Sequence, residues 1–202
     1  MPCVRQYAQP VGGKITIDGI DIAEIDATFY RRNMLAFCDQ VPEFIPGTVR
    51  DNLRLLNTAV TDGEILEIFR EIGAADFAER FDNFLDLKIE ERDIFNIATK
   101  NLLNIVRTLL KTAPIYVFNQ CFEHVNPDYV ARVFEKIRRE GKTCLFITQN
   151  TAVSKHCDRV YVLKKGAVSS VGVHSELIAG CRDYCELCLS SGGRIFSAES
   201  VV

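Results

Sequence analysis

The stretch "IYVFNQCFEHVN" spans residues 115–126 and decides how the surrounding chain folds. Its first four residues are apolar and favour extended backbone, which predicts a short buried strand. That strand ends in two side-chain amides, Asn119 and Gln120. In α/β folds the chemistry lies at the carboxyl ends of the strands. Asn119 and Gln120 have the shapes of Asp and Glu without the charge, so they are poorly suited to hold a metal or to activate a water.

Helices and strands alternate around this stretch. Residues 61–73 predict a helix, because Thr61 and Glu64 fit a capping box and Gly73 fits a helix stop. Strands are expected at 12–19, 34–38, 115–118 and 142–150, further helices at 75–81, 99–112, 126–141 and 153–156, a hairpin turn at Lys165-Gly166 and a final helix at 175–189. This order favours an α/β fold with a mainly parallel sheet, into which a helical block of about residues 50–112 is inserted.

The composition restricts the function. The chain has 202 residues and a formal charge of −3, which indicates about one globular domain with no electrostatic preference for nucleic acid. No apolar run approaches the ~18 residues that span a bilayer, and we expect no signal peptide. The eight cysteines are mostly scattered through apolar segments. They predict free thiols in a reducing compartment rather than a disulfide framework.

The order of the segments resembles the nucleotide-binding domain of ABC transporters, most closely the exporter type. The resemblance runs roughly from Arg5 to Leu187 and is carried by "GGKITIDGIDI", "CDQVPEFIPGTVRDNL", "RTLLKTAPIYVF", "KTCLFITQN" and "CDRVYVLKKGAV" with the following "GVHSELIA". It places Gln40 at the glutamine of the Q-loop. The family binds ATP and Mg²⁺.

At the family's catalytic positions this sequence departs from the pattern. The resemblance implies a Walker B Asp that supports Mg²⁺ and a Glu that polarises the attacking water, where this chain has Asn119 and Gln120. The switch histidine is replaced by Gln149 and the D-loop aspartate by Asn126. The LSGGQ signature reads "FNIAT" and lacks both glycines, so its backbone cannot approach a phosphate as closely; its residues are Phe95, Asn96, Ile97, Ala98 and Thr99.

The resemblance also places the family's phosphate loop, G-x-x-G-x-G-K-[ST], before Arg5, and the 202 residues do not contain that motif. Gly12-Gly13-Lys14 opens a strand instead of a helix, so we interpret it as a turn. The resemblance implies that the phosphate-loop strand lies in the sheet beside strands such as Ile115 to Phe118. We therefore expect ladder groups without partners there, and a chain that is poorly stable alone and pairs with another.

Three further candidates remain open. Gln40 could contact a metal or a membrane partner, or be a solvated loop residue. Cys181, Cys185 and Cys188 would share one face of a helix, where they could bind zinc with His174 or form a packed apolar stripe. His156 and His174 could be ligands or bases. The resemblance places His174 where the family often has His, and a structural role is the simpler interpretation for that residue.

The resulting interpretation is an α/β, mainly parallel sheet of the P-loop ABC-ATPase type, N-terminally truncated, with a helical subdomain. Residues 1–49 would form the first part of the core with the Q-loop, and residues 50–103 the helical subdomain with a degenerate signature. Residues 104–189 would complete the core, and 190–202 would be a flexible tail. Whether the chain is an enzyme is left open, and this copy is expected to be inactive.

The function that follows is a degenerate ABC exporter ATP-binding domain that works as an interaction module. Its expected partners are a transporter's transmembrane domain and a second nucleotide-binding domain in a homo- or heterodimer, but not nucleic acid. It would lie in the cytoplasm, at the inner face of a membrane, held there by a partner. No cofactor and no metal are expected for this chain. The alternatives are a C-terminal fragment of an ATP-binding subunit that drives export, and a remnant without function.

Overall fold

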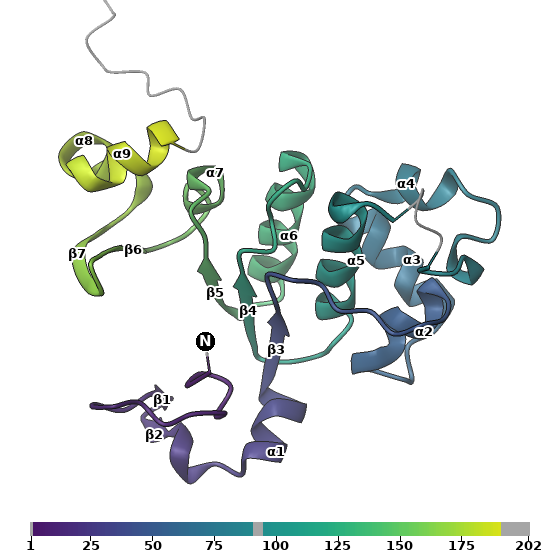
Figure 1. Cartoon of the computed structure of the whole chain (residues 1–202), viewed down its shortest axis with the longest axis horizontal. Coiled ribbons are helices and arrows are strands. Elements are labelled where there is room, and N and C mark those ends of the chain that lie inside the picture. The colour runs from purple at the N-terminus through teal and green to yellow at the C-terminus, as the bar shows by residue number, and fades with distance from the viewer. Residues whose placement is uncertain (1, 91–94, 191–202) are drawn as a thin grey trace, which may run out of the picture.

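The computed structural model describes residues 2–90 and 95–190, so most of the predicted tail, from residue 191 on, lies outside the described residues. Figure 1 shows the arrangement of its elements. In chain order these are β1 (Thr16–Ile17), β2 (Ile20–Asp21), α1 (Ala27–Phe29), β3 (Leu35–Cys38), α2 (Val49–Leu53), α3 (Asp62–Glu71), α4 (Ala75–Glu79), α5 (Ile97–Leu109), β4 (Ile115–Asn119), α6 (Pro127–Arg139), β5 (Thr143–Ile147), α7 (Thr151–Ser154), β6 (Val160–Lys164), β7 (Ala167–Gly172), α8 (His174–Gly180) and α9 (Arg182–Ser190).

The central sheet has three parallel strands in the order β3-β4-β5. In Figure 1 the three strands run side by side with their carboxyl ends at the same edge. The middle strand, β4, carries Tyr116, Val117 and Phe118, each at most 2% exposed. Burial on both faces is typical of a parallel strand between helices. The predicted α/β fold with a parallel sheet is therefore confirmed.

The two faces of this sheet are covered differently. Helices α5 and α6 pack on one face, where Phe134 stacks on Phe146 with ring centroids 4.1 Å apart and Phe146 stacks on Phe118 at 5.3 Å. On the other face, Val117 packs against Leu35 and the buried Tyr30, together with apolar side chains from the first 25 residues and Ile147. The amino-terminal segment thus serves as the cover for the second face.

The helical block consists of α2 to α5. Its best-predicted helix is α3, whose Thr61–Glu64 capping box and Gly73 stop, with φ +76°, are confirmed. A Cβ on Gly73 would lie 2.8 Å from the flexible end of the Arg132 side chain, which can move aside, so the positive φ is the main reason for glycine here. Lys136 on α6 is buried and donates to Glu71 of α3 over 2.6 Å and to Glu140 over 2.5 Å. These contacts join the block to the core.

The C-terminal unit is the β6–β7 hairpin with α8 and α9. Its predicted turn is confirmed, because Lys165 and Gly166 have φ of +50° and +80°. The prediction of one continuous final helix is wrong: Cys181 has an extended backbone and separates α8 from α9. Tyr184 is buried and bonds to both Ser154 of α7, at 2.5 Å, and His174, at 2.7 Å. This chain of hydrogen bonds attaches the unit to α7.

Two other strand predictions require correction. The strand predicted at 12–19 is two residues long, because Asp18 and Gly19, with φ of +49° and +84°, turn the chain into the β1–β2 hairpin. Asp18-Gly19 is one of the turn signals expected to bound this strand, and it forms the hairpin turn. Met34 is not in β3, since it ends a π-helical turn, Tyr30–Met34, that closes with the Leu35 N–H donating to the Tyr30 carbonyl.

The expected location of the unpaired edge is also wrong. Ile115 to Phe118 have strand neighbours on both sides, β3 and β5. The strand left with a free edge among the described residues is β5, because no described strand pairs with its other side. Across residues 2–90 and 95–190, none of the helices is both long enough and apolar enough to cross a membrane.

The buried ion pair between α3 and α6 gives a stability prediction. Lys136→Met should lower the free energy of unfolding by about 3 kcal/mol, because it leaves Glu71 partly buried beside an exposed Arg139. Lys155→Met, at an exposed position, is the control and should change little. Chemical denaturation at neutral pH measures both.

The same pair predicts an acid dependence. Burial alone would raise the pKa of Glu71, but the Lys136 hydrogen bond and charge outweigh it and lower that pKa below 4.5. Because the folded-state pKa is the lower one, the contribution is present at neutral pH and is lost as the pH falls through that value. Lys136→Met should flatten this acid limb. Equal acid sensitivity in both proteins would contradict the assignment.

Candidate functional site at the strand ends

Four of the predicted site residues come from adjacent strand ends. Asn119 closes β4 opposite Ile147, and Cys38, the last residue of β3, pairs with Phe118. Gln40 therefore leaves the sheet beside Asn119 and Gln120, and Gln149 leaves it on the other side. Gln40 and Gln149 are exposed, whereas Asn119 and Gln120 are half-buried. The fold brings these positions to one edge of the sheet, as their places at strand ends predicted.

Gln120 has an unusual backbone. Its φ is +50°, which is uncommon for a residue with a Cβ. Its N–H nevertheless donates to the Ile147 carbonyl over 2.8 Å, so the ladder with β5 extends one residue beyond β4. The next residue, Cys121, is fully buried, and burial together with the neighbouring Cys38 raises the pKa of its thiol. A protonated, inaccessible thiol is not a nucleophile.

The loop that carries Gln40 is held by helix α5. Asn104 is buried and donates from Nδ2 to the Asp39 carbonyl over 3.0 Å. Arg107 donates to the Glu43 carbonyl over 2.9 Å and to Asn104 Oδ1 over 2.8 Å, and its guanidinium lies 5.0 Å from the Phe44 ring centroid. Burial lowers the pKa of Arg107. The backbone on both sides of Gln40 is therefore fixed from one helix.

The same helix also holds the segment after β4. Asn101, within the buried stripe of α5, is 3% exposed and donates from Nδ2 to the Glu123 carbonyl over 2.8 Å. Its Oδ1 is buried without a hydrogen-bond partner. Sequence reasoning missed Asn101, Asn104 and Arg107 because it read α5 through its apolar residues. The available signal was a polar residue at helical spacing within an apolar stripe.

Two of the candidate residues act as helix caps. Asn126 accepts from the Asp128 N–H over 2.9 Å at the start of α6, as its Asn-Pro pair predicted. Asn96 accepts from the Thr99 N–H over 3.0 Å at the start of α5. Helix α5 thus begins at Ile97, earlier than expected, and the five signature-position residues surround its first turn. Phe95 is buried there, and Ile97 is 53% exposed.

The donor set does not fit Mg²⁺. The candidate residues at the strand ends are all amides, namely Gln40, Asn119, Gln120 and Gln149. Mg²⁺ takes carboxylate or phosphate oxygens in preference to neutral amide oxygens, and a Gln cannot accept a proton near neutral pH. Within residues 2–90 and 95–190, no group of three or more His, Cys, Asp or Glu side chains could hold a metal ion.

The remaining candidates lie away from this edge. Cys181 donates to Ser170 and Cys185 to the Ile178 carbonyl, and Cys181 is outside α9, so the three thiols do not share one helix face as predicted. His174 bonds to Tyr184. His156 packs on Phe134 at 5.2 Å, where burial, Lys155 and Arg138 lower its pKa. The contact with Tyr184 suits the structural role that was the simpler interpretation for His174.

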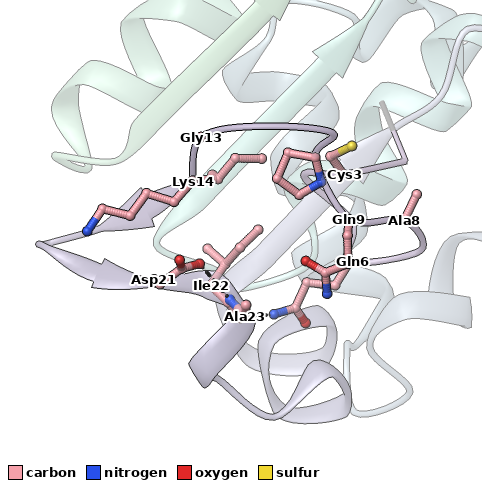
Figure 2. Close-up of a pocket in the computed structure, with 11 residues that line it drawn as sticks. Cys3, Gln6, Ala8, Gln9, Gly13, Lys14, Asp21, Ile22 and Ala23 are labelled. Atoms are coloured by element: carbon pink, nitrogen blue, oxygen red, sulfur yellow. Dashed lines mark hydrogen bonds between the residues drawn. The ribbon is translucent and has the colours of Figure 1, made fainter.

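A small pocket lies at the opposite end of the sheet. Figure 2 shows it between the amino-terminal turn and the β1–β2 hairpin, with Gln6 and Asp21 on its wall. Gly13 and Lys14 line it just before β1, so the Gly-Gly-Lys run precedes a strand as expected. Gln6 donates to the Ile22 and Ile25 carbonyls, which leaves its Oε1 buried without a partner. The pocket is separate from the strand-end candidates.

Proteins of the ABC transporter family are similar to this chain in sequence, and one of them shares its parallel sheet, inserted helical block and closing hairpin. No family model matches the sequence. The chain is related to ATP-binding and exporter proteins of the ABC transporter family. It is 28% identical over 187 residues to an ATP-dependent lipid A-core flippase of Syntrophus aciditrophicus. The aligned region covers 91% of this chain and 31% of the flippase.

Two further proteins of the ABC transporter family are similar to this chain. ABC transporter B family member 1 of Dictyostelium discoideum is 25% identical over 179 residues, 87% of this chain and 20% of that protein. A bacterial Atm1-family ABC exporter with ATP bound shares the fold with a TM-score of 0.84 and 23% identity, over 96% of this chain and 34% of that chain. The chain thus spans less than a third of the length of the curated relatives named here.

The hydrogen bonds from α5 to the Gln40 loop give a prediction. Asn104→Leu removes the donor to Asp39 and the acceptor of Arg107, so it should cost about 1–3 kcal/mol and speed amide hydrogen exchange in residues 39–46. Asn33→Leu, an exposed residue that bonds within its own turn, is the control. Unchanged exchange in residues 39–46, with a normal response elsewhere, would show that Asn104 does not hold the loop.

Proposed function

We propose that this chain is a catalytically silent ABC exporter ATP-binding domain, or part of one, that serves as an interaction module. The observation that carries the proposal is an amide at each strand-end position where the resemblance implies a catalytic acid or base, namely Asn119, Gln120 and Gln149. An amide keeps a hydrogen-bonding side chain at the site, but it supplies neither a charge for Mg²⁺ nor a base for water. Binding of a partner needs neither.

The surface offered to a transmembrane domain would be the loop after Gln40 and the start of the helical block. Val41 and Ile45 are 70% and 45% exposed, and Leu55 and Leu56 are 42% and 41% exposed. The loop backbone is fixed by Asn104, Arg107 and Asn52, whose Oδ1 accepts from the Ile45 N–H over 2.8 Å. Apolar side chains on a fixed backbone suit a docking surface, because little ordering is required on binding.

The proposal extends to partner and location. The chain would pair with a second nucleotide-binding domain, with a transmembrane domain, or with both, on the cytoplasmic side of a membrane. A chromatographic test is direct: co-expression with a transporter subunit from the same genome should yield a complex that survives size exclusion. Val41→Asp with Ile45→Asp should break that complex and leave the free chain folded. A complex that tolerates both changes would remove the proposed docking surface.

A second candidate is a C-terminal part of an ATP-binding subunit that drives export. It is favoured by the share of the relatives that the chain covers, 20% and 31% in the two named above. The coding sequence upstream of the Met1 codon separates the candidates. A phosphate-loop motif in frame supports this second candidate, whereas an immediate stop codon supports the first or a remnant without function.

Catalytic silence gives a direct prediction. The 202-residue chain should show no ATPase activity, and Gln120→Glu alone should restore none, because groups that act as a unit fail together. An active ABC transporter ATP-binding domain, assayed beside it, verifies the assay. Mg²⁺-dependent turnover above a no-protein blank would end the proposal.

Nucleotide affinity provides an independent prediction. The 202 residues do not contain the phosphate-loop motif that supplies most of the family's contacts to ATP, so titration of this chain with labelled ATP and Mg²⁺ should not saturate in the micromolar range. Saturation at about 1 μM, equivalent to about 8 kcal/mol of binding free energy, would mean that the nucleotide site has been misplaced.

A further inference from the structure

A pocket of about 340 Å³ lies in the helical block. Its lining comes from α2, α3, α4 and the segment 81–86 that follows α4. Figure 1 shows these three helices at the end of the molecule opposite the C-terminal unit. Small-molecule sites typically have volumes of ~300–1,000 Å³, so this pocket is at the small end of that range. It shares no residue with the strand-end candidates or with the exposed apolar residues of the docking surface.

Three phenylalanine rings line this pocket. Phe69 of α3 and Phe84 meet edge to face, with ring centroids 5.4 Å apart, and Phe81 stacks on Phe84 at 6.2 Å. Phe69 and Phe84 are buried, whereas Phe81 is half-buried. Aromatic rings pack favourably on a further ring, either face to face with an offset or edge to face. The lining therefore suits a ligand with a flat aromatic body.

The positions of these rings are fixed within the block. Asn83 has a left-handed backbone, with φ +55°, a conformation that Asn adopts more readily than most residues. It lies between Phe81 and Phe84, at the start of the 3₁₀ turn Phe84–Asp86. Phe77 of α4 contacts both rings, at 5.9 Å from Phe81 and 5.5 Å from Phe84. A pocket whose walls are already packed requires little ordering when a ligand binds.

The two guanidinium groups of the lining are both paired. Arg50 donates to the two carboxylate oxygens of Asp62, over 2.9 and 3.2 Å, and to Asp86. These hydrogen bonds, that to Asp62 above all, raise the pKa of Arg50, so it stays charged. Arg70 pairs with Glu67, which does not line the pocket. An anionic ligand would have to displace a carboxylate from one of these pairs, which disfavours anions here.

One carboxylate of the lining is left over. Three carboxylates, Asp62, Glu79 and Asp86, face two guanidinium groups, Arg50 and Arg70. Glu79, the last residue of α4, has no hydrogen bond and no ion pair with another residue of the part of the chain that the structure describes. A surplus negative charge favours a cationic ligand, and the faces of aromatic rings also attract positive charge.

We propose that the pocket of the helical block binds a small aromatic amine, a flat ring system that carries one ammonium group. The ligand's rings would pack on Phe69, Phe81 and Phe84, and its ammonium group would lie toward Glu79. An uncharged aromatic ligand would fill the pocket but leave Glu79 without a partner, and an anion would be repelled by it. The site is separate from the strand-end residues, and it does not depend on the proposed function.

The test uses three ligands with the same ring and different charges: naphthylmethylamine, which is protonated at neutral pH, naphthylmethanol and naphthylacetate. Calorimetric titration of the 202-residue chain should show saturable binding of the amine, about tenfold tighter than naphthylacetate, with the alcohol between them. The amine should slow amide hydrogen exchange in residues 75–86 and leave exchange in residues 39–46 unchanged.

Two glutamate substitutions test the position of the charge. Glu79→Gln should weaken binding of the amine by about three- to fivefold, as expected for one ion pair near solvent, and leave binding of the alcohol unchanged. Glu135→Gln, the same change at an exposed residue of α6 that does not line the pocket, should alter neither. Because Glu79 is exposed and has no partner among the described residues, its substitution should leave the chain folded.

A third substitution fills the pocket. Ala75 is half-buried and lines it, so Ala75→Phe should abolish binding of the amine and of the alcohol, while a cooperative melt verifies the fold. If this variant does not fold, the comparison of Glu79→Gln with Glu135→Gln decides alone. Undiminished binding by folded Ala75→Phe, equal affinities for the amine and naphthylacetate, equal effects of the two glutamate substitutions, or no saturation of the unsubstituted chain by about 1 mM amine would each overturn the inference.

Discussion

The parallel pairing of β4 with strands on both sides is the constraint on which the rest of this structure depends. Its middle residues Tyr116, Val117 and Phe118 are almost fully buried. A strand that is apolar on both faces needs a neighbour at each edge and a layer on each face, because its backbone groups cannot reach water. Helices α5 and α6 supply one layer and the amino-terminal segment the other. The strand ends meet at one edge as a consequence of this pairing.

Helix α5 holds the loops at that edge of the sheet. Its apolar face joins the core, and its buried amides Asn101 and Asn104 each bond to a carbonyl of a different loop. A buried amide is tolerated when it is hydrogen-bonded, which holds for both ends of the Asn104 amide, whereas the Oδ1 of Asn101 is buried without a partner. The first turn of α5 also carries the signature-position residues. One helix therefore contacts three candidate segments: the signature positions, the Gln40 loop and the segment after β4.

Local signals in the sequence predicted the elements that are governed by local physics. The capping box at Thr61 and the turn at Lys165-Gly166 depend on residues within one turn of the chain, and both are confirmed. The break at Cys181 had a local signal, since Gly180 directly precedes it and ends α8, and the prediction of one helix passed over that glycine. The other misjudged features depend on tertiary contacts, because the partners of β4 are set by strands far away in the sequence. Asn104 was missed because its partner, Asp39, is equally remote. The roles of the strand-end residues follow from resemblance and remain proposals.

The amides at the strand ends are consistent with a chain that keeps its architecture without the chemistry. Asn119 and Gln120 are half-buried, next to the fully buried Cys121. Two neighbouring carboxylates at this place would repel each other and would be partly desolvated, which costs free energy unless a cation compensates. Neutral amides avoid that cost and keep a hydrogen-bonding side chain of the same shape. By this argument, Asn119 and Gln120 cost less free energy at these positions than an Asp-Glu pair would in the absence of a cation.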